Sequence, residues 1–192
     1  MSGTRVLAGE SGRVRGAGPA PGLLLASQLI FNVGFFSVVP FLAVSMRGDF
    51  GMGALAIGAV LGARTFAQQG MFLFGGVLAD RWGARRLMVS GTLVRVAGYL
   101  VLAWAADFPS FLAGAIITGV GGALFSPALE SLVGTARSME TGNAGTGAKP
   151  TLFALLVIFG EIGAVAGPVL GALLLGVGID AALLAGAAIF AV

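Results

Sequence analysis

The sequence contains no cysteine and no histidine, so it lacks the residues of disulfides, of thiol chemistry, of the common zinc sites and of histidine-based proton shuttles. Charged side chains are also scarce, at 10% of residues against about 25% in soluble proteins. No dense basic patch with interleaved aromatic residues is present, which argues against nucleic-acid binding. Because the sequence also shows no nucleophile–base pair, metal-ligand cluster or phosphate loop, we expect no enzymatic activity, no cofactor and no metal site.

Apolar residues, in contrast, dominate the chain. They make up 57% of its 192 residues, and 33 more residues are glycine. A water-soluble fold of this size could not bury so much apolar surface. Small residues let membrane helices approach closely, so the glycine content fits the same environment. The composition therefore predicts an integral membrane protein with membrane lipid as its solvent.

Long apolar stretches separated by short polar breaks predict the organisation of the chain. A spanning helix needs about 20 mainly apolar residues, and five stretches meet this length: 22–46, 54–79, 87–106, 109–133 and 150–175. A sixth, 179–192, extends for roughly 21 Å as a helix, less than the ~30 Å hydrocarbon core. We therefore expect the chain to stop inside a sixth helix. Residues 1–21, rich in Gly, Ala, Pro and Arg, are expected to form a disordered cytoplasmic arm.

The distribution of basic residues predicts the orientation. With the N-terminus in the cytoplasm, the outside segments contain only Arg47. The inside segments contain Arg5, Arg13, Arg15, Arg81, Arg85, Arg86, Arg137 and Lys149. Since cytoplasmic loops carry the excess of Lys and Arg, we expect a multi-pass protein of the cell membrane with its N-terminus inside.

The break between the second and third stretches has a distinctive pattern, Gly76-Val-Leu-Ala-Asp80-Arg81-Trp82-Gly83-Ala84-Arg85-Arg86. Gly76 permits close helix approach, and Gly83 gives the backbone freedom to reverse within a few residues. Asp80 lies at a helix C-terminus, where the helix dipole disfavours an acid, so it needs a compensating partner. Arginines alone would suit any positive-inside loop, but the spacing of the acid and the glycine is more specific.

This segment resembles the signature loop of the major facilitator superfamily, G-x-L-A-D-R-x-G-x-R-R. The resemblance implies an all-α integral membrane fold, namely the six-helix N-terminal bundle of the major facilitator fold, truncated within helix 6. It also implies that Gly76, Asp80, Arg81, Gly83, Arg85 and Arg86 form a cytoplasmic gate loop. In the family this loop latches the N-terminal half to a C-terminal six-helix half, which is missing here.

The fifth stretch carries Gly163-Ala-Val-Ala-Gly167-Pro168-Val-Leu-Gly171-Ala172. It resembles the antiporter motif of drug exporters, G-x-x-x-G-P-x-x-G-G, with Ala172 at the last glycine. Gly163, Gly167 and Gly171 lie four residues apart and form one smooth helix face. The alternative is ordinary small-residue packing without any exporter function.

Other segments resemble the multidrug-exporter branch of twelve-helix drug–proton antiporters. These are the segments around Asn32 and Pro40, Arg64-Thr-Phe-Ala-Gln68, Arg95-Val-Ala-Gly98, and Gly119 to Pro127. One departure is clear. Ala115 stands where these antiporters usually carry a helix 4 arginine, which puts a simple transfer of their coupling mechanism in doubt.

Arg64, Arg95 and Glu161 are charged residues that fall away from the ends of the predicted spans. An intramembrane charge is costly, so it usually faces a cavity and has a partner. We expect Asn32, Arg64, Gln68, Arg95 and Glu161 to serve the transport cavity or its coupling, with Glu161 exchanging a proton or meeting a cationic compound. The equal alternative for Glu161 is a fixed Arg–Glu pair between helices, and for Arg95 a structural role is favoured. Glu130 is a candidate partner of Arg85 or Arg86.

Three functions remain open from the sequence. The first is a secondary transporter, here only its N-terminal half, that exports hydrophobic or cationic compounds in exchange for protons. The second is a transporter of a polar or anionic metabolite such as a sugar or organic acid, which two buried arginines would suit. The third is a truncated fragment that does not transport.

Overall fold

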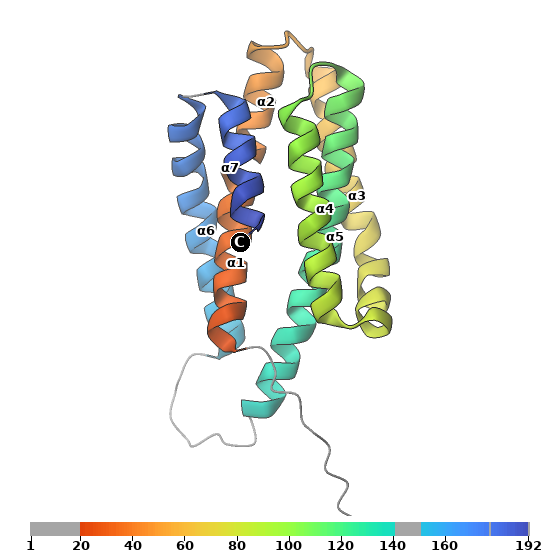
Figure 1. Cartoon of the computed structure of the whole chain (residues 1–192), viewed down its shortest axis with the longest axis vertical. Coiled ribbons are helices and arrows are strands. Elements are labelled where there is room, and N and C mark those ends of the chain that lie inside the picture. Colours follow the sequence, from red (N-terminus) through yellow and green to blue (C-terminus); the bar gives the residue numbers. More distant parts are fainter. Residues whose placement is uncertain (1–19, 141–150, 177, 192) are drawn as a thin grey trace, which may run out of the picture.

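The computed structural model describes residues 20–140, 151–176 and 178–191, and every regular element in these residues is an α-helix (Figure 1). The helices are α1 (Pro21–Phe36), α2 (Val39–Gly48), α3 (Ala54–Trp82), α4 (Ala84–Ala103), α5 (Phe108–Glu140), α6 (Leu152–Leu175) and α7 (Ile179–Ala191). The predicted arm falls almost wholly outside the described residues, as does most of the connection between α5 and α6.

The first predicted span is divided at Ser37 and Val38 into α1 and α2. The physical reason is Pro40, which has no N–H and whose ring clashes with the carbonyl four residues earlier. Val38 N–H consequently bonds to the oxygen of Phe35 rather than to that of Gly34. The freed Gly34 oxygen accepts from Ser37 Oγ at 3.1 Å and from the Tyr99 hydroxyl at 3.3 Å. The break between α1 and α2 is thus hydrogen-bonded to α4 through Tyr99.

The connection between α3 and α4 is a single residue, Gly83, which has φ +86° and ψ 133°. A left-handed φ of this kind is accessible to glycine and strained for other residues, so Gly83 lets α4 start three residues before its predicted beginning. At its other end α4 stops at Ala103. The backbone N–H groups of Ala106 and Asp107 bond instead to Ser110 Oγ in the first turn of α5.

Four described segments are long and apolar enough to cross a membrane: Pro21–Gly48, Ala84–Ala103, Phe108–Gly134 and Leu152–Leu174. The 29-residue helix α3 is also long enough, but its middle carries Arg64, Gln68 and Gln69. The outer surface of the bundle is strongly apolar. On α3 alone, Leu55 is 89% exposed and Phe66 is 79% exposed. Such side chains suit contact with lipid tails.

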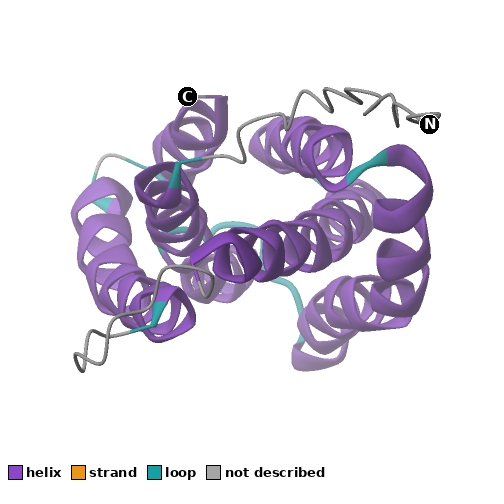
Figure 2. Cartoon of the chain, turned by 90° about the horizontal axis from the view of Figure 1, so that it is seen from below, coloured by secondary structure: helices purple, strands orange, loops and turns teal. Residues whose placement is uncertain are grey.

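The helices form two groups, seen side by side in Figure 1: α1, α6 and α7 on one side, and α3, α4 and α5 on the other. In the second group α5 packs against both α3 and α4, while α7 joins the groups by packing on α4. The end view in Figure 2 shows the helices running roughly parallel to one long axis.

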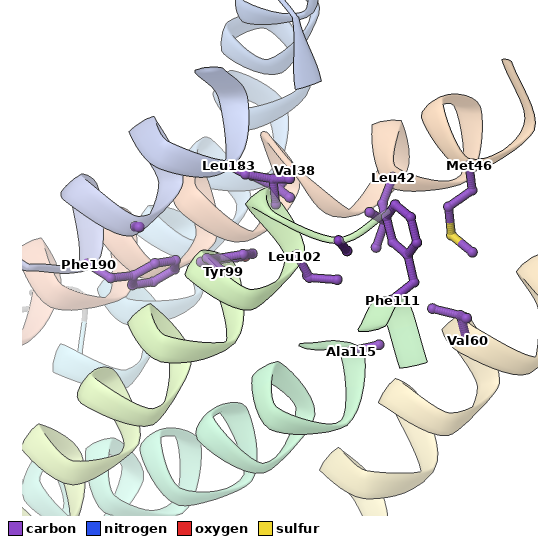
Figure 3. Close-up of a cluster of buried hydrophobic side chains, with 12 residues drawn as sticks. Val38, Leu42, Met46, Val60, Tyr99, Leu102, Phe111, Ala115, Leu183 and Phe190 are labelled. Carbon is purple, nitrogen blue, oxygen red and sulfur yellow. The ribbon is translucent and has the colours of Figure 1, made fainter. Parts of the chain in front are cut away.

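The main core lies where α2, α4, α5 and α7 approach one another (Figure 3). Tyr99 of α4 stacks on Phe190 of α7, with ring centres 5.5 Å apart. Ala115, at the position where the resembled antiporters carry an arginine, is fully buried among these apolar side chains. A second cluster around Leu24, Phe125, Leu129 and Leu156 joins α1, α5 and α6 lower in the bundle.

Candidate functional site

A cavity of about 260 Å³ opens between α1, α3, α5 and α6. Its lining is more polar than its position in an apolar bundle would suggest. The lining residues are Gln28, Phe31, Asn32, Phe35, Phe36, Gln68, Ser126, Leu129, Glu130 and Leu156. Three amides, one hydroxyl and one carboxyl thus share the cavity with three phenylalanine rings. Among the lining residues Glu130 is the one that carries a charge.

Helical periodicity explains how these side chains come together. Residues four apart lie on the same helix face, so Gln28, Asn32 and Phe36 form one stripe on α1. On α5 the corresponding stripe is Ser126 and Glu130, preceded one turn earlier by Gly122. A Cβ on Gly122 would lie 3.1 Å from the Gln68 amide carbon. The α5 stripe therefore faces Gln68 of α3 at Gly122, and it faces the cavity at Ser126 and Glu130.

Hydrogen bonds orient two of the cavity amides. Arg64 Nη2 donates to Gln68 Oε1 at 3.0 Å, one turn apart on α3. Because a guanidinium group can only donate, the Gln68 oxygen must face Arg64, and its NH₂ group is left to serve other acceptors. Asn32 Nδ2 donates to the backbone oxygen of Gln28 at 3.0 Å. Asn32 therefore retains its side-chain oxygen as an acceptor.

Arg95 lies behind the cavity wall and is almost fully buried, at 1% exposure. None of its three guanidinium nitrogens has a hydrogen-bond partner among the described residues. Aromatic faces surround it instead: its Cζ lies 4.0 Å from the ring centre of Phe31 and 5.0 Å from that of Phe190. Phe35 lies between the two arginines, with its ring centre 4.5 Å from Arg64 Cζ and 5.2 Å from Arg95 Cζ. Cation–π attraction is worth ~2 kcal/mol when desolvated, less than the several kcal/mol that burying an ion costs.

Glu161 is placed apart from this group. It is exposed on the outer face of α6, in an apolar groove formed with Ile162, Val165, Ala166, Val169, Leu170 and Leu173. Within the described residues Glu161 forms no ion pair with Arg64 or Arg95. The Arg95 guanidinium nitrogens form no hydrogen bond there. Asn32, Arg64, Gln68 and Arg95 are thus brought together, whereas Glu161 is not.

The glycine face of α6 packs directly against α1. A Cβ on Gly163 would lie 2.6 Å from Asn32 Cβ, and one on Gly167 would lie 2.6 Å from Phe36 Cβ. A Cβ on Gly171 would overlap the backbone oxygen of Ser37. The small residues therefore allow α6 to touch the backbone of α1 beside the cavity and beside the helix break. Pro168 is inside α6, next to this contact.

The residues of the predicted gate loop lie at the junction of α3 and α4. Arg81, Arg85 and Arg86 are exposed, as is Trp82 at 60%. Gly76 and Asp80 belong to α3, and beyond their helical backbone they lie outside the described part of the structure. Glu130 lines the cavity, and the described residues show no ion pair that joins it to Arg85 or Arg86.

Sequence reasoning missed Gln28, Ser126, the phenylalanines of α1 and the cavity role of Glu130. A signal for part of this group was present. Successive helical residues are rotated by about 100°, so the four-residue spacing from Gly122 through Ser126 to Glu130 marks one polar stripe. The same rule puts Glu161, two residues before Gly163, on the face of α6 opposite to the glycine run.

Comparison with known proteins now identifies the family. The sequence model of the Major Facilitator Superfamily matches residues 24–192. An uncharacterized MFS-type transporter of Mycobacterium tuberculosis is 38% identical over 168 residues, which cover 88% of this chain and 38% of that protein.

Two further relatives are named multidrug resistance protein MdtH. That of Cronobacter sakazakii is 36% identical over 153 residues, covering 79% of this chain and 36% of the relative. That of Klebsiella pneumoniae is 35% identical over 168 residues, which cover 87% of this chain and 40% of the relative. The chain spans about two fifths of the length of these relatives. It belongs to the major facilitator superfamily of membrane transport proteins, as the Gly76–Arg86 pattern predicted, and it is a multi-pass membrane protein.

Proposed function

We propose that this chain forms the N-terminal six-helix bundle of a secondary transporter that exports hydrophobic or cationic compounds in exchange for protons. The observation that carries the proposal is the cavity among α1, α3, α5 and α6, which combines aromatic rings and amides within an apolar membrane bundle with one exposed carboxyl group, that of Glu130. Similarity to proteins named for multidrug resistance supports the choice of substrate class. Transporters of this kind bind substrate near the bilayer midplane, between two repeat halves.

In this proposal residues 22–192 form the transmembrane bundle in the cell membrane, with the N-terminus in the cytoplasm. The gate loop at Gly83, with Arg81, Arg85 and Arg86 exposed beside it, faces the cytoplasm and contacts a second six-helix half. The glycine face of α6 supports the exporter class, because it lets α1 and α6 pack closely beside the cavity. The protein binds lipid, substrate and protons, and it has no enzymatic activity.

The test is the accumulation of ethidium in cells that carry or lack the gene encoding this chain. We expect deletion to raise ethidium accumulation and a reintroduced gene to lower it again. A protonophore should abolish the difference, because export then has no driving force. Equal accumulation with and without the gene would contradict the proposal, and would favour the alternative of a chain that does not transport.

A second candidate is the transport of an anionic metabolite. It is favoured by one observation, the two buried arginines that meet at Phe35 without an acidic partner in the described residues. A guanidinium pair suits a carboxylate. Purified protein that binds a dicarboxylate such as succinate, and does not bind ethidium, would establish this function in place of drug export.

A further inference from the structure

The cavity has opposite electrical character at its two ends. At its open end lies the carboxyl group of Glu130, which is exposed and lies one turn below Ser126 on α5. At the other end lies Gln68. Its side-chain oxygen accepts a hydrogen bond from Arg64, so its NH₂ group is the part that faces the cavity. Gly122 of α5 lies at the level of Gln68 and eight residues before Glu130, which is about 12 Å along the helix axis. A ligand therefore meets an acceptor end and a donor end.

Fixed positive charge strengthens this polarity. Arg64 and Arg95 both lie against Phe35, which lines the donor end of the cavity. The described residues give the Arg95 guanidinium group no acceptor that would neutralise it, and in a low-dielectric interior its field reaches further than in water. A cationic ligand is therefore repelled from the Gln68 end of the cavity and attracted to the Glu130 end.

The wall between the two ends is aromatic. Phe31, Phe35 and Phe36 present their rings along the α1 side, and the Phe31 ring is itself fixed by stacking on Phe125, with centres 4.1 Å apart. Because Phe125 and Arg95 occupy the two faces of the Phe31 ring, rings placed in this way hold apolar or aromatic groups by burial and edge contacts. The wall therefore suits the body of a ligand rather than its charged group.

We propose that the cavity binds a monovalent organic cation in one orientation, with its charged group at Glu130 and its apolar body against the phenylalanines of α1. Glu130 is thus the specificity-determining residue for charge, and Glu161 on the outer face of α6 has no part in binding. The inference deepens the proposed function and rests on it for the class of substrate.

The first test measures equilibrium binding of benzyltrimethylammonium to the purified chain in detergent micelles, with benzenesulfonate as an anion of similar ring size. We expect the wild-type protein to bind the cation and to discriminate against the anion. Glu130→Gln should weaken cation binding at least about tenfold, because it removes the charge but keeps the size. Glu130→Asp should restore much of the affinity. Glu161→Gln is the matched control, and its affinity should equal that of the wild type.

Three results would overturn the proposal: equal cation affinity of wild type and Glu130→Gln, tighter binding of benzenesulfonate than of the cation, or no cation binding by the folded wild-type protein. These results are separable from the ethidium assay. A gene that lowers ethidium accumulation while Glu130→Gln binds normally would uphold export and reject the role of Glu130.

The second test does not depend on Glu130→Gln folding. Because the chain has no cysteine, Ser126→Cys and Phe36→Cys each introduce a unique thiol near one end of the cavity. Their reaction rates are measured with a trimethylammonium-ethyl and a sulfonato-ethyl methanethiosulfonate. The ratio of cationic to anionic rate should be higher for Ser126→Cys than for Phe36→Cys. An equal or reversed order would show that the cavity lacks the proposed polarity.

Discussion

The guanidinium carbon of Arg95 lies 4.0 Å from the ring centre of Phe31, and this aromatic contact replaces the hydrogen bonds that a buried arginine usually forms. The other face of the Phe31 ring stacks on Phe125, and Phe31 is also one of the residues that line the cavity. A positive charge is therefore held one ring away from the place where a substrate would bind, which links the buried charge to the function of the cavity rather than to the stability of the bundle.

Replacing Arg95 by Met tests this interpretation. Removing an unpaired buried charge and filling its space with an apolar side chain should raise stability by about 1–4 kcal/mol, even after the loss of cation–π contacts. Thermal unfolding of the purified protein in detergent should thus shift upward, while ethidium export in cells should fall. A clear loss of stability with unchanged export would show that Arg95 serves only to hold the helices together.

The contact between α6 and α1 predicts a strong effect at Gly171. Its added Cβ would overlap the Ser37 oxygen and would also lie 2.8 Å from Phe41 Cδ2. We expect Gly171→Ala to destabilise the protein by roughly 1–3 kcal/mol, as overpacking does. Gly62→Ala on α3 is the matched control, since nothing lies within 4 Å of its Cβ, and this change should be neutral or slightly stabilising. Similar unfolding temperatures for both variants would refute the tight contact.

The connection at Gly83 makes a separate prediction, based on backbone conformation rather than contact. An added Cβ meets nothing within 4 Å, yet φ is +86°. Gly83→Ala should therefore cost about 1–3 kcal/mol through strain alone. Gly70→Ala, in the regular helix of α3 and equally open, should stabilise by about 0.5–1 kcal/mol. If Gly83→Ala and Gly70→Ala changed the unfolding temperature in the same direction, the left-handed φ of Gly83 would be contradicted.

Asp107, between α4 and α5, gives a pH dependence. Its Oδ1 accepts from both the Oγ and the N–H of Ser110, and these bonds hold the pKa of Asp107 below its ordinary value of 3.8. Since the folded state favours the charged form, the stabilisation is present above pH 3.8 and is lost as the pH falls through the lowered pKa.

The comparison of wild type with Asp107→Ala checks this sign. The variant should unfold at a lower temperature at pH 7, and the difference should shrink as the pH approaches 3. Asp107→Asn, which keeps an acceptor without the charge, should lie between them at pH 7. A difference that widens on acidification would mean that the carboxylate does not stabilise the start of α5.

The sequence predicted the helices well because length and apolarity determine membrane spans. Helices α3, α5 and α6 begin within two residues of their expected first residues. Pro40 was visible, but the break it causes at Ser37 depends on Tyr99 and Ser37 satisfying the Gly34 oxygen, which is a tertiary relationship. The grouping of Asn32, Arg64, Gln68 and Arg95 likewise required knowing which helices are neighbours.

Glu161 shows the limit of reasoning from proximity in sequence. Its charge inside a predicted span suggests a place in the cavity, yet it lies two residues before Gly163. A two-residue step turns a helix by roughly 200°, which puts Glu161 on the face away from the glycine run. The position of Glu130 near the end of its span suggests a pair with the loop arginines, whereas its register with Gly122 and Ser126 brings it to the cavity. Helix phase would have separated the two acids.

The most direct test of the account compares proton-dependent ethidium export by cells that produce Glu130→Gln or Glu161→Gln at equal levels in the membrane. We expect Glu130→Gln to lose export, because the cavity then lacks its carboxylate. Glu161→Gln should export at the wild-type rate, because Glu161 lies on the exposed outer face of α6, away from the cavity. Loss of export in Glu161→Gln with normal export in Glu130→Gln would contradict it.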